Sequence, residues 1–255
     1  MKKGILPLLA GAAIALLAVF MPSCSKKAPP LVVLTSGDIA PFAMVDKEGT
    51  LCGFDVDLIK MLAKCMNRDI EFKSLPFEDV MNGIKTKQGD VALGGISITK
   101  EREEIFDLTA TGHSGGFVLL ALESTVINSL ADLCEKMIGV RAGSLQESKA
   151  KREWDDNYRN LFVKSYKSFN SEEIVAKLRG GELAAIVLDI DEAKYIAARN
   201  NGLKIVPLDA GTFEMGFVTT KGSVYSDEIS KFMKENKEKV DELEIKWFSA
   251  KSDFS

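Results

Sequence analysis

The sequence predicts an α/β fold with a largely parallel sheet. Short apolar segments of β type alternate with segments that have helical periodicity, and this alternation occurs twice along the chain. Strands separated by helices of this length run parallel in one sheet, and ligands of such sheets bind at the carboxyl ends of the strands. The loops that leave those ends are therefore where a binding site is expected.

The first alternating set follows residue 30. Its expected elements are a strand at residues 31–35, a loop at 36–42, a hairpin turn at 46–49, a helix at 54–66, a strand at 70–73, a helix at 77–85 and a strand at 91–93. The loops at 36–42, 74–77 and 94–102 all leave strand ends on one side. They are predicted to converge on one cleft.

The second set begins near residue 117. Its expected strands are residues 117–122, 137–140, 162–164, 184–188, 203–207 and 215–219, and its expected helices are 129–133, 145–154, 172–178, 192–198 and a long terminal segment at 224–247. The loop Arg141-Ala142-Gly143-Ser144, which is rich in small residues, separates a strand from a helix, an arrangement that suits an anion at the helix start.

The stretch VALGGISITKEREEIF, residues 91–106, concentrates a cation and free backbone donors. Thr99 is expected to cap a helix whose first turn contains Arg102. A cation there does not complement the helix dipole, so a bound carboxylate would satisfy the guanidinium and the unpaired N–H groups together. The alternative, a surface Arg102 paired with a neighbouring glutamate, remains open from this stretch alone.

Residues 1–23 are typical of a secretory signal. Lys2 and Lys3 precede the apolar run at 5–20, and Cys24 then follows a small residue. Cys24 resembles the lipidation site of bacterial lipoproteins, although Met21-Pro22 depart from the usual residues before it. Residues 24–30 would form a linker between a lipid anchor in the membrane and the folded body.

The mature chain of 232 residues carries 31 basic and 37 acidic residues. No basic stripe with aromatics among the lysines is visible, so nucleic acid is not an expected partner. Cys52, Cys65 and Cys134 have no spacing typical of a metal site or a disulfide framework, and buried free thiols are expected. Neither a cofactor nor a metal is expected.

Five segments, in order, resemble the amino-acid-binding proteins that serve ABC importers, in the polar amino-acid branch (solute-binding protein family 3). They are APFAMVDKEGTLCGFDVDL, LPFEDVMNGIKTKQGDVALGGISITKERE, SLADLCEKMIGVRAGS, LRGGELAAIVLDIDEAKY and the terminal IKWF. The resemblance implies the type II periplasmic-binding-protein fold, with two lobes joined by two crossing strands and a ligand cleft between them. Lobe 1 would comprise residues 31–117 plus 213–255, and lobe 2 residues 118–212.

The resemblance also implies a ligand site. Arg102 would hold the α-carboxylate of a free amino acid, and Asp189 would pair with its ammonium group. The other implied ligand contacts are Ser36, Asp38, Ile39, Phe77, Gly95, Ser97, Thr99, Arg141, Gly143 and Ser144. Ile39 replaces a usual aromatic residue, Ser36 stands where many relatives have an acid, and Arg141 adds a cation beside the side-chain position. These departures argue against lysine or arginine as ligand.

The implied function is capture of an amino acid and delivery to a permease in the cytoplasmic membrane, by a monomer anchored in the periplasm or at the cell surface. From residue types alone, Phe77 and Ile39 could instead be core residues, Asp189 a helix cap and Arg141 a partner of Glu147. His113, the single histidine, is expected to line the cleft rather than act as a base.

Two other classes remain open from the sequence. One is a cyclohexadienyl dehydratase-like enzyme on the same fold, for which Glu214 and Asp38 are the available acids. The other is a ligand-sensing domain for a membrane receptor. No nucleophile motif is present, so no catalytic residue is assigned.

Overall fold

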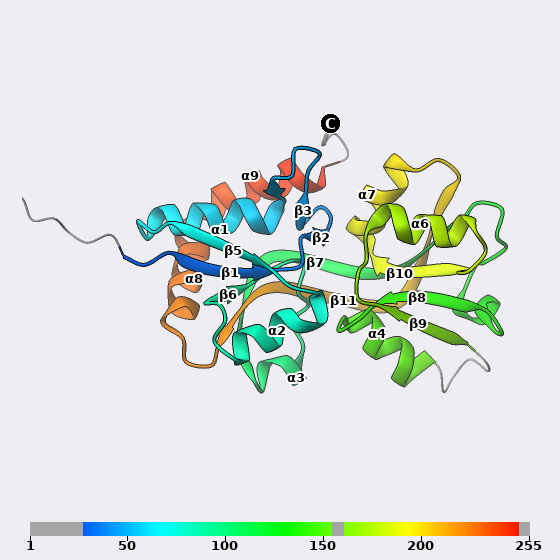
Figure 1. The fold of residues 1–255 in the computed structure, drawn as a ribbon, viewed down its shortest axis with the longest axis horizontal. Coiled ribbons are helices and arrows are strands. Elements are labelled where there is room, and N and C mark those ends of the chain that lie inside the picture. The colour runs from blue at the N-terminus through cyan, green and yellow to red at the C-terminus, as the bar shows by residue number, and fades with distance from the viewer. Residues whose placement is uncertain (1–27, 155–160, 250–255) are drawn as a thin grey trace, which may run out of the picture.

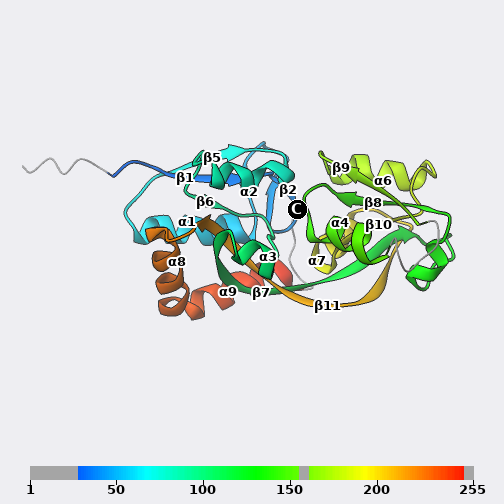
Figure 2. The ribbon, with the colours of Figure 1, turned by 90° about the horizontal axis from the view of Figure 1, so that it is seen from below.

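The computed structural model describes residues 28–154 and 161–249. They form two lobes that lie side by side (Figure 1). The long strands β7 (Phe106–Leu122) and β11 (Leu203–Thr220) run through both lobes and connect them (Figure 2). This arrangement confirms the predicted two-lobed α/β fold with two crossing strands.

The remaining elements alternate as the sequence predicts. The strands are β1 (Leu31–Thr35), β2 (Asp38–Ile39), β3 (Ala43–Val45), β4 (Leu51–Cys52), β5 (Ile70–Ser74), β6 (Val91–Ala92), β8 (Met137–Arg141), β9 (Phe162–Tyr166) and β10 (Ala185–Asp189). The helices are α1 (Phe54–Cys65), α2 (Phe77–Lys85), α3 (Lys100–Glu103), α4 (Leu145–Lys149), α6 (Ser171–Arg179), α7 (Ile190–Arg199), α8 (Val224–Glu235) and α9 (Lys237–Phe248), with short η1 (Leu130–Leu133) and η2 (Ala150–Trp154).

One large sheet extends through the whole molecule, in the strand order β5-β1-β6-β11-β7-β10-β8-β9. The β1–β5, β1–β6, β8–β10 and β8–β9 pairs are parallel, while β7 and β11 pair antiparallel to each other and to β10 and β6. The carboxyl ends of the parallel strands of the two lobes face each other. The loops after β1, β5 and β6 therefore meet those after β8, β9 and β10.

Each lobe has its own hydrophobic core. The core of the first lobe draws on residues 31–106 and on the terminal segment, where Met215, Phe217, Ile229 and Trp247 are buried. The second lobe has clusters on both faces of its sheet, between residues 117 and 206. Because the chain returns to the first lobe after β11, helices α8 and α9 complete the core that the first residues begin.

Several expected boundaries are wrong. The strand expected at 117–122 begins at Phe106, and the two expected at 203–207 and 215–219 are one continuous strand, β11. The helical segment expected at 145–154 changes from α-helix to π-helix at Ala150. The terminal segment is broken at Asn236, which has non-helical φ and ψ of −120° and 27°.

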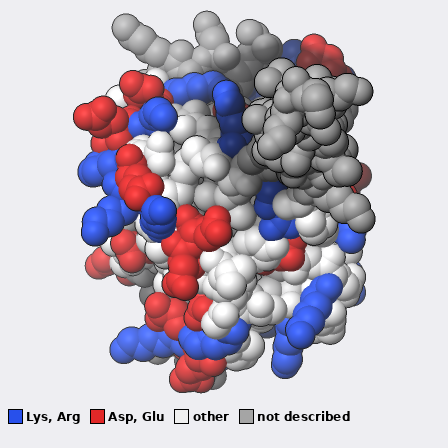
Figure 3. Space-filling view, turned by 90° about the vertical axis from the view of Figure 1, so that its left-hand side faces the viewer, with Lys and Arg blue, Asp and Glu red and all other residues white. Residues whose placement is uncertain are grey.

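The free cysteines are also more accessible than expected. Cys52 is partly buried, but Cys65 and Cys134 are exposed, so the prediction of buried thiols is wrong for these two residues. On the outer end of the first lobe, acidic and basic side chains are interspersed (Figure 3). Within the two described ranges, no helix has the length and apolar character needed to cross a bilayer.

Candidate functional site

The facing loops of the two lobes touch at several points. Lys167 forms an ion pair with Glu78 at 2.5 Å, and the Phe169 N–H donates to Asp38 Oδ2 at 3.1 Å. Gly143 has a φ of 76°, and a Cβ built on it would lie 2.6 Å from Glu78 Cα. Only a glycine therefore lets the second lobe approach α2 this closely. The lobes are in direct contact around the predicted cleft.

Arg102 lies at this contact. Thr99 caps α3 as predicted, and its Oγ1 accepts from the Arg102 N–H at 3.3 Å. The guanidinium donates from Nη1 to the Ser97 carbonyl (2.6 Å) and from Nη2 across the cleft to the Gly143 carbonyl (3.2 Å). Burial lowers the pKa of Arg102 to about 10, against the opposing charge of Glu101. A guanidinium has five N–H donors, so donors remain for a carboxylate.

The loop that carries this arginine is held by a residue that the sequence analysis did not single out. Asp55 on α1 is 2% exposed, and its Oδ2 accepts from the N–H groups of Gly94 (2.9 Å) and Gly95 (2.8 Å). Burial raises the pKa of Asp55 to about 6. The signal in the sequence was an acid among the apolar residues of an amphipathic helix, where a buried carboxylate needs fixed donors.

Asp189 occupies the carboxyl end of β10 in the second lobe and is 3% exposed. Its Oδ1 accepts from the Asp191 N–H at 2.9 Å, so it caps α7, and its Oδ2 accepts from the Gly116 N–H at 3.1 Å. Burial, followed by the negative charge of Asp191, raises its pKa to about 6. The alternative prediction that Asp189 caps the helix after it is thus confirmed. A nearby cation would stabilise the ionised form.

Two buried hydroxyl groups without a hydrogen-bond partner lie at the carboxyl end of β1. They are Thr35 Oγ1, at the last residue of the strand, and Ser36 Oγ, at the first residue of the loop. Unsatisfied buried polar atoms are rare and costly, so two neighbouring hydroxyls in this state indicate a place where a polar ligand can bind.

Arg141 lies between the lobes and is 5% exposed. Its Nη2 is 2.6 Å from Glu192 Oε1, and its Nη1 is 2.8 Å from Asp38 Oδ1. Burial raises the pKa of Glu192 to about 7, although the Arg141 charge opposes this shift. The alternative prediction that Arg141 pairs with Glu147 is wrong, because Glu147 binds Lys151 and the Gly143 N–H instead.

Three other predicted ligand contacts, Ile39, Phe77 and Ser144, make contacts within the protein. Ile39 (5% exposed) and Phe77 (6%) belong to the core of the first lobe, which confirms the alternative prediction that they are core residues. The Phe77 ring also faces Arg141, with 5.9 Å from the arginine Cζ to the ring centroid. The Ser144 hydroxyl caps α4 and donates to the Arg141 carbonyl at 2.7 Å. The side chains of Ile39 and Ser144 thus already have structural roles.

His113 lies on β7, between the lobes. Its Nε2 is 3.1 Å from Asp191 Oδ2 on α7, and its Nδ1 is 3.2 Å from Glu244 Oε1 on α9. The ring stacks on Phe248, with centroids 3.9 Å apart. Burial by itself lowers the pKa of His113, but the hydrogen bonds to Asp191 and Glu244 outweigh it and the pKa is raised. A protonated His113 therefore links α7 of the second lobe with α9 of the first.

This linkage predicts a pH-dependent contribution to stability. A histidine with a raised pKa in the folded state stabilises the protein fully below its unfolded pKa of about 6.5, and the contribution is lost as pH rises through the folded pKa. We expect His113→Gln to lower the free energy of unfolding by about 1–3 kcal/mol near pH 6 and by less above pH 8. Urea denaturation across this range measures the difference, and a difference that grows with pH would contradict the assignment.

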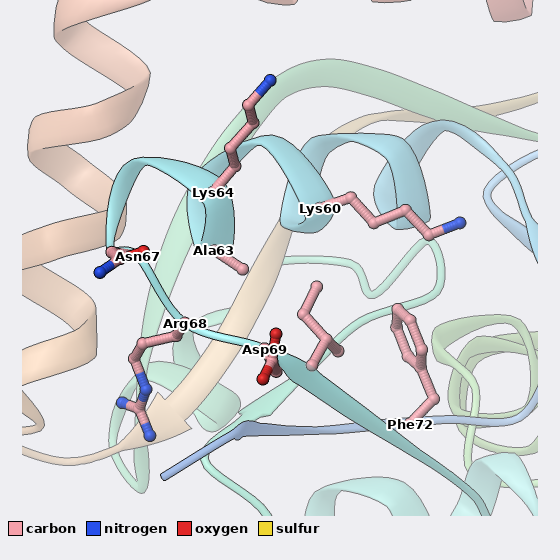
Figure 4. A pocket seen from close by; sticks show the side chains of 8 residues that line it. Lys60, Ala63, Lys64, Asn67, Arg68, Asp69 and Phe72 are labelled. Atoms are coloured by element: carbon pink, nitrogen blue, oxygen red, sulfur yellow. The ribbon is translucent and has the colours of Figure 1, made fainter. Parts of the chain in front are cut away.

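One hollow lies on the first lobe alone, and a second lies between the lobes. One, of about 460 Å³, lies on the first lobe between α1 and β5 and is lined by Lys60, Lys64, Arg68 and Phe72 among others (Figure 4). The other, of about 1080 Å³, separates the β2–β3–β4 sheet and α9 from α6 and α7, and it includes Asp38 and Asn170. Neither is lined by Arg102 or Asp189, and both exceed the size of an amino acid.

The acids considered for catalysis are not poised for proton transfer. Glu214 is exposed on β11, and Asp38 is paired with Arg141. Among the described residues, no group of three or more His, Cys, Asp or Glu side chains is arranged to hold a metal ion.

Sequence relatives support an amino-acid-binding role for this type of site. The chain is 31% identical over 225 residues to the arginine-binding extracellular protein ArtP of Bacillus subtilis, with 86% of each chain covered. It is 31% identical over 198 residues to a probable histidine-binding protein of Neisseria gonorrhoeae, with 74% of this chain and 71% of that protein covered.

Solved structures of amino-acid-binding proteins have a similar fold. An ancestral arginine-binding protein bound to arginine matches with a TM-score of 0.79 and 30% identity, over 88% of this chain and all of that one. An ancestral amino-acid-binding protein described as a precursor of cyclohexadienyl dehydratase matches with a TM-score of 0.76 and 27% identity, over 86% of this chain and 96% of that one. The profile of bacterial extracellular solute-binding proteins, family 3, matches residues 31–250, and the chain belongs to this family.

Proposed function

We propose that the protein captures one free amino acid between its lobes, with the α-carboxylate on Arg102 and the α-ammonium at Asp189. The observation that carries the proposal is a pair of opposite charges, the partly buried Arg102 and the buried Asp189, which the two lobes contribute at their facing edges. Arg102 retains donors, and burial raises the pKa of Asp189 although the charge of His113 opposes the shift, which supports a further cation as its partner. A zwitterion supplies both missing charges.

This placement gives the ligand a direct role in closure. We assign residues 31–117 plus 213–255 to lobe 1 and 118–212 to lobe 2, a division supported by the separate hydrophobic cores. Arg102 then belongs to lobe 1 and Asp189 to lobe 2. Since each charge of the ligand is satisfied by a different lobe, the ligand binds the closed arrangement better than an open one and shifts the population toward it.

The closed, loaded protein would deliver its amino acid to the permease of an ABC importer, acting as a monomer. A relative in Haemophilus influenzae, 32% identical over 109 residues, is named a probable amino-acid ABC transporter-binding protein. Native mass spectrometry of gently purified protein, followed by calorimetry against the free amino acids, tests the binding role. Absence of any amino-acid binder would contradict it.

Binding should depend on pH through Asp189. With a pKa of about 6 in the unliganded protein, Asp189 must lose its proton before it pairs with an ammonium group, so affinity rises as pH increases through 6. We expect the dissociation constant at pH 5 to be roughly 10-fold higher than at pH 7.5. Calorimetry in buffers of different ionisation enthalpy would detect proton release near pH 6. Asp189→Asn should bind more weakly and lose this pH dependence.

We further propose that Cys24, which lies outside the described residues, carries a lipid anchor and that residues 1–23 are removed. Cys24→Ala should move the protein from the membrane fraction to the soluble extracytoplasmic fraction, because a single cysteine would bear the acyl chains. Ligand affinity should stay unchanged, since residues 24–30 separate the anchor from the lobes. Membrane retention of the variant protein would contradict this assignment.

A catalytic role is not part of the proposal. Catalysis on this fold would need an acid held near a leaving group, whereas Glu214 is exposed and Asp38 is ion-paired. We expect no turnover of prephenate or arogenate by the purified protein. Turnover that is lost in Glu214→Gln would overturn this assignment.

A further inference from the structure

The surroundings of the Arg141 guanidinium are those of a site for a cationic ligand. The Phe169 ring lies beneath it, with 4.5 Å from Cζ to the ring centroid, and the Phe77 ring lies 5.9 Å away. Carboxylates of Asp38 and Glu192 contact its two terminal nitrogens at 2.8 and 2.6 Å. Aromatic faces and paired carboxylates are the groups with which proteins recognise a guanidinium.

This cluster lies next to the proposed amino-acid clamp. Arg141 ends β8, two residues before Gly143, whose carbonyl accepts from Arg102. Glu192 is on α7, three residues after Asp189, so the two acids share one face of the helix. Asp38 follows the β1 loop, and its carbonyl also accepts from Arg141 Nη2 at 3.3 Å. The side chain of an amino acid held by Arg102 and Asp189 would extend toward this cluster.

We propose that Arg141 is the specificity-determining residue of this site: its own guanidinium occupies the position of a cationic side chain, and the protein therefore selects an amino acid whose side chain is uncharged. This inference rests on the proposed amino-acid-binding function. The guanidinium excludes arginine and lysine by occupying the space and by charge repulsion. The carboxylates of Asp38 and Glu192 in turn disfavour an acidic side chain.

The unsatisfied atoms define the side chain further. The Thr35 and Ser36 hydroxyls, at the end of β1 next to Asp38, lack a hydrogen-bond partner, and each offers a donor and an acceptor. A side chain with an amide or a hydroxyl group would satisfy a donor and an acceptor together. The chain would thus differ in ligand class from its relatives that are named arginine-binding proteins.

The test uses Arg141→Ala, which removes the guanidinium and leaves the rings and carboxylates. Methylguanidinium is the first probe, because it reports on the emptied position without requiring an amino-acid ligand. It should raise the melting temperature of Arg141→Ala in a saturable way and leave the wild-type protein and Arg179→Ala unaffected. Arg179 is an exposed arginine of α6 in the same lobe and controls for loss of one positive charge.

L-Arginine is the second probe. It should bind Arg141→Ala about 10- to 100-fold more tightly than the wild-type protein, while the wild-type protein prefers an amino acid with an uncharged side chain. If Arg141→Ala does not fold because Glu192 is left unpaired, the double variant Arg141→Ala/Glu192→Gln retains Asp38 and Phe169 without a buried lone charge. The same two probes then apply to it.

Specific outcomes overturn the inference. Wild-type protein that binds L-arginine or L-lysine as tightly as any uncharged amino acid refutes it while leaving the proposed function intact. A folded variant that responds neither to methylguanidinium nor to L-arginine also refutes it. If the wild-type protein binds no amino acid at all, the proposed function fails, and the methylguanidinium response alone decides whether Arg141 fills a guanidinium site.

Discussion

Arg102→Ala should weaken binding of the cognate amino acid by roughly 30-fold to several thousand-fold. The substitution leaves the ligand α-carboxylate without its charged partner in a partly buried site, a loss of about 2–5 kcal/mol. It also removes the bond from Arg102 Nη2 to the Gly143 carbonyl, which joins the lobes. Calorimetry gives the affinity, and thermal melts should show that the ligand no longer raises the melting temperature.

Lys100→Ala is the matched control. Lys100 is an exposed cation two residues away on the same short helix, so its loss changes the local charge equally without reaching the contact between the lobes. Its effect on binding should be within a factor of about 2, as expected for an exposed charge. Equal affinity of the wild-type protein and Arg102→Ala, measured with a clear amino-acid binder, would show that Arg102 is not the carboxylate site.

The elements with strong periodicity could be predicted from the sequence. The helix α2 has the bounds that its pattern predicts, and Thr99 caps α3 as its position before Lys100 suggests. The crossing strands could not be predicted in full. Residues 111–116 consist of glycine, serine, threonine and histidine, so the sequence shows no apolar–polar alternation there, although the structure buries the alternate residues Thr111, His113 and Gly115.

The site shows a similar division. Arg102 is recognisable because it follows a strand end at the start of a helix, whereas Asp189 was implied by the family resemblance. The structure brings both to the facing edges of the lobes. The partners of Arg141 were not predictable, since Glu192, Asp38 and Phe169 are distant from it in sequence, and Asp38 also belongs to the other lobe. Long-range pairing of this kind leaves no local periodicity.

Asp55 is a second residue whose role depends on such pairing, and it provides the largest expected effect on stability. Its Oδ2 is the common acceptor of the Gly94 and Gly95 N–H groups, so Asp55→Ala leaves two buried donors unsatisfied at about 1–3 kcal/mol each. We expect a loss of about 2–6 kcal/mol near pH 5, where the carboxyl group is largely protonated. Weaker ligand binding should accompany it, because the same loop leads to Arg102.

The pH dependence of this loss identifies its cause. Burial raises the pKa of Asp55 from its ordinary value of 3.8 to about 6, so the folded state holds the proton more tightly and wild-type stability falls as pH rises from 4 to 6 and then levels off. At about 1.4 kcal/mol per pKa unit, ionisation offsets about 3 kcal/mol, and the loss in Asp55→Ala should therefore be smaller at pH 8 than at pH 5.

Asp55→Asn is the matched control, because its amide oxygen can accept from both glycines without a charge. It should retain most of the stability at pH 5 and lack the fall between pH 4 and 6. Urea denaturation of the three proteins at both pH values measures these differences, and a loss in Asp55→Ala that increases toward pH 8 would show that Asp55 supports the loop as a stabilised anion instead.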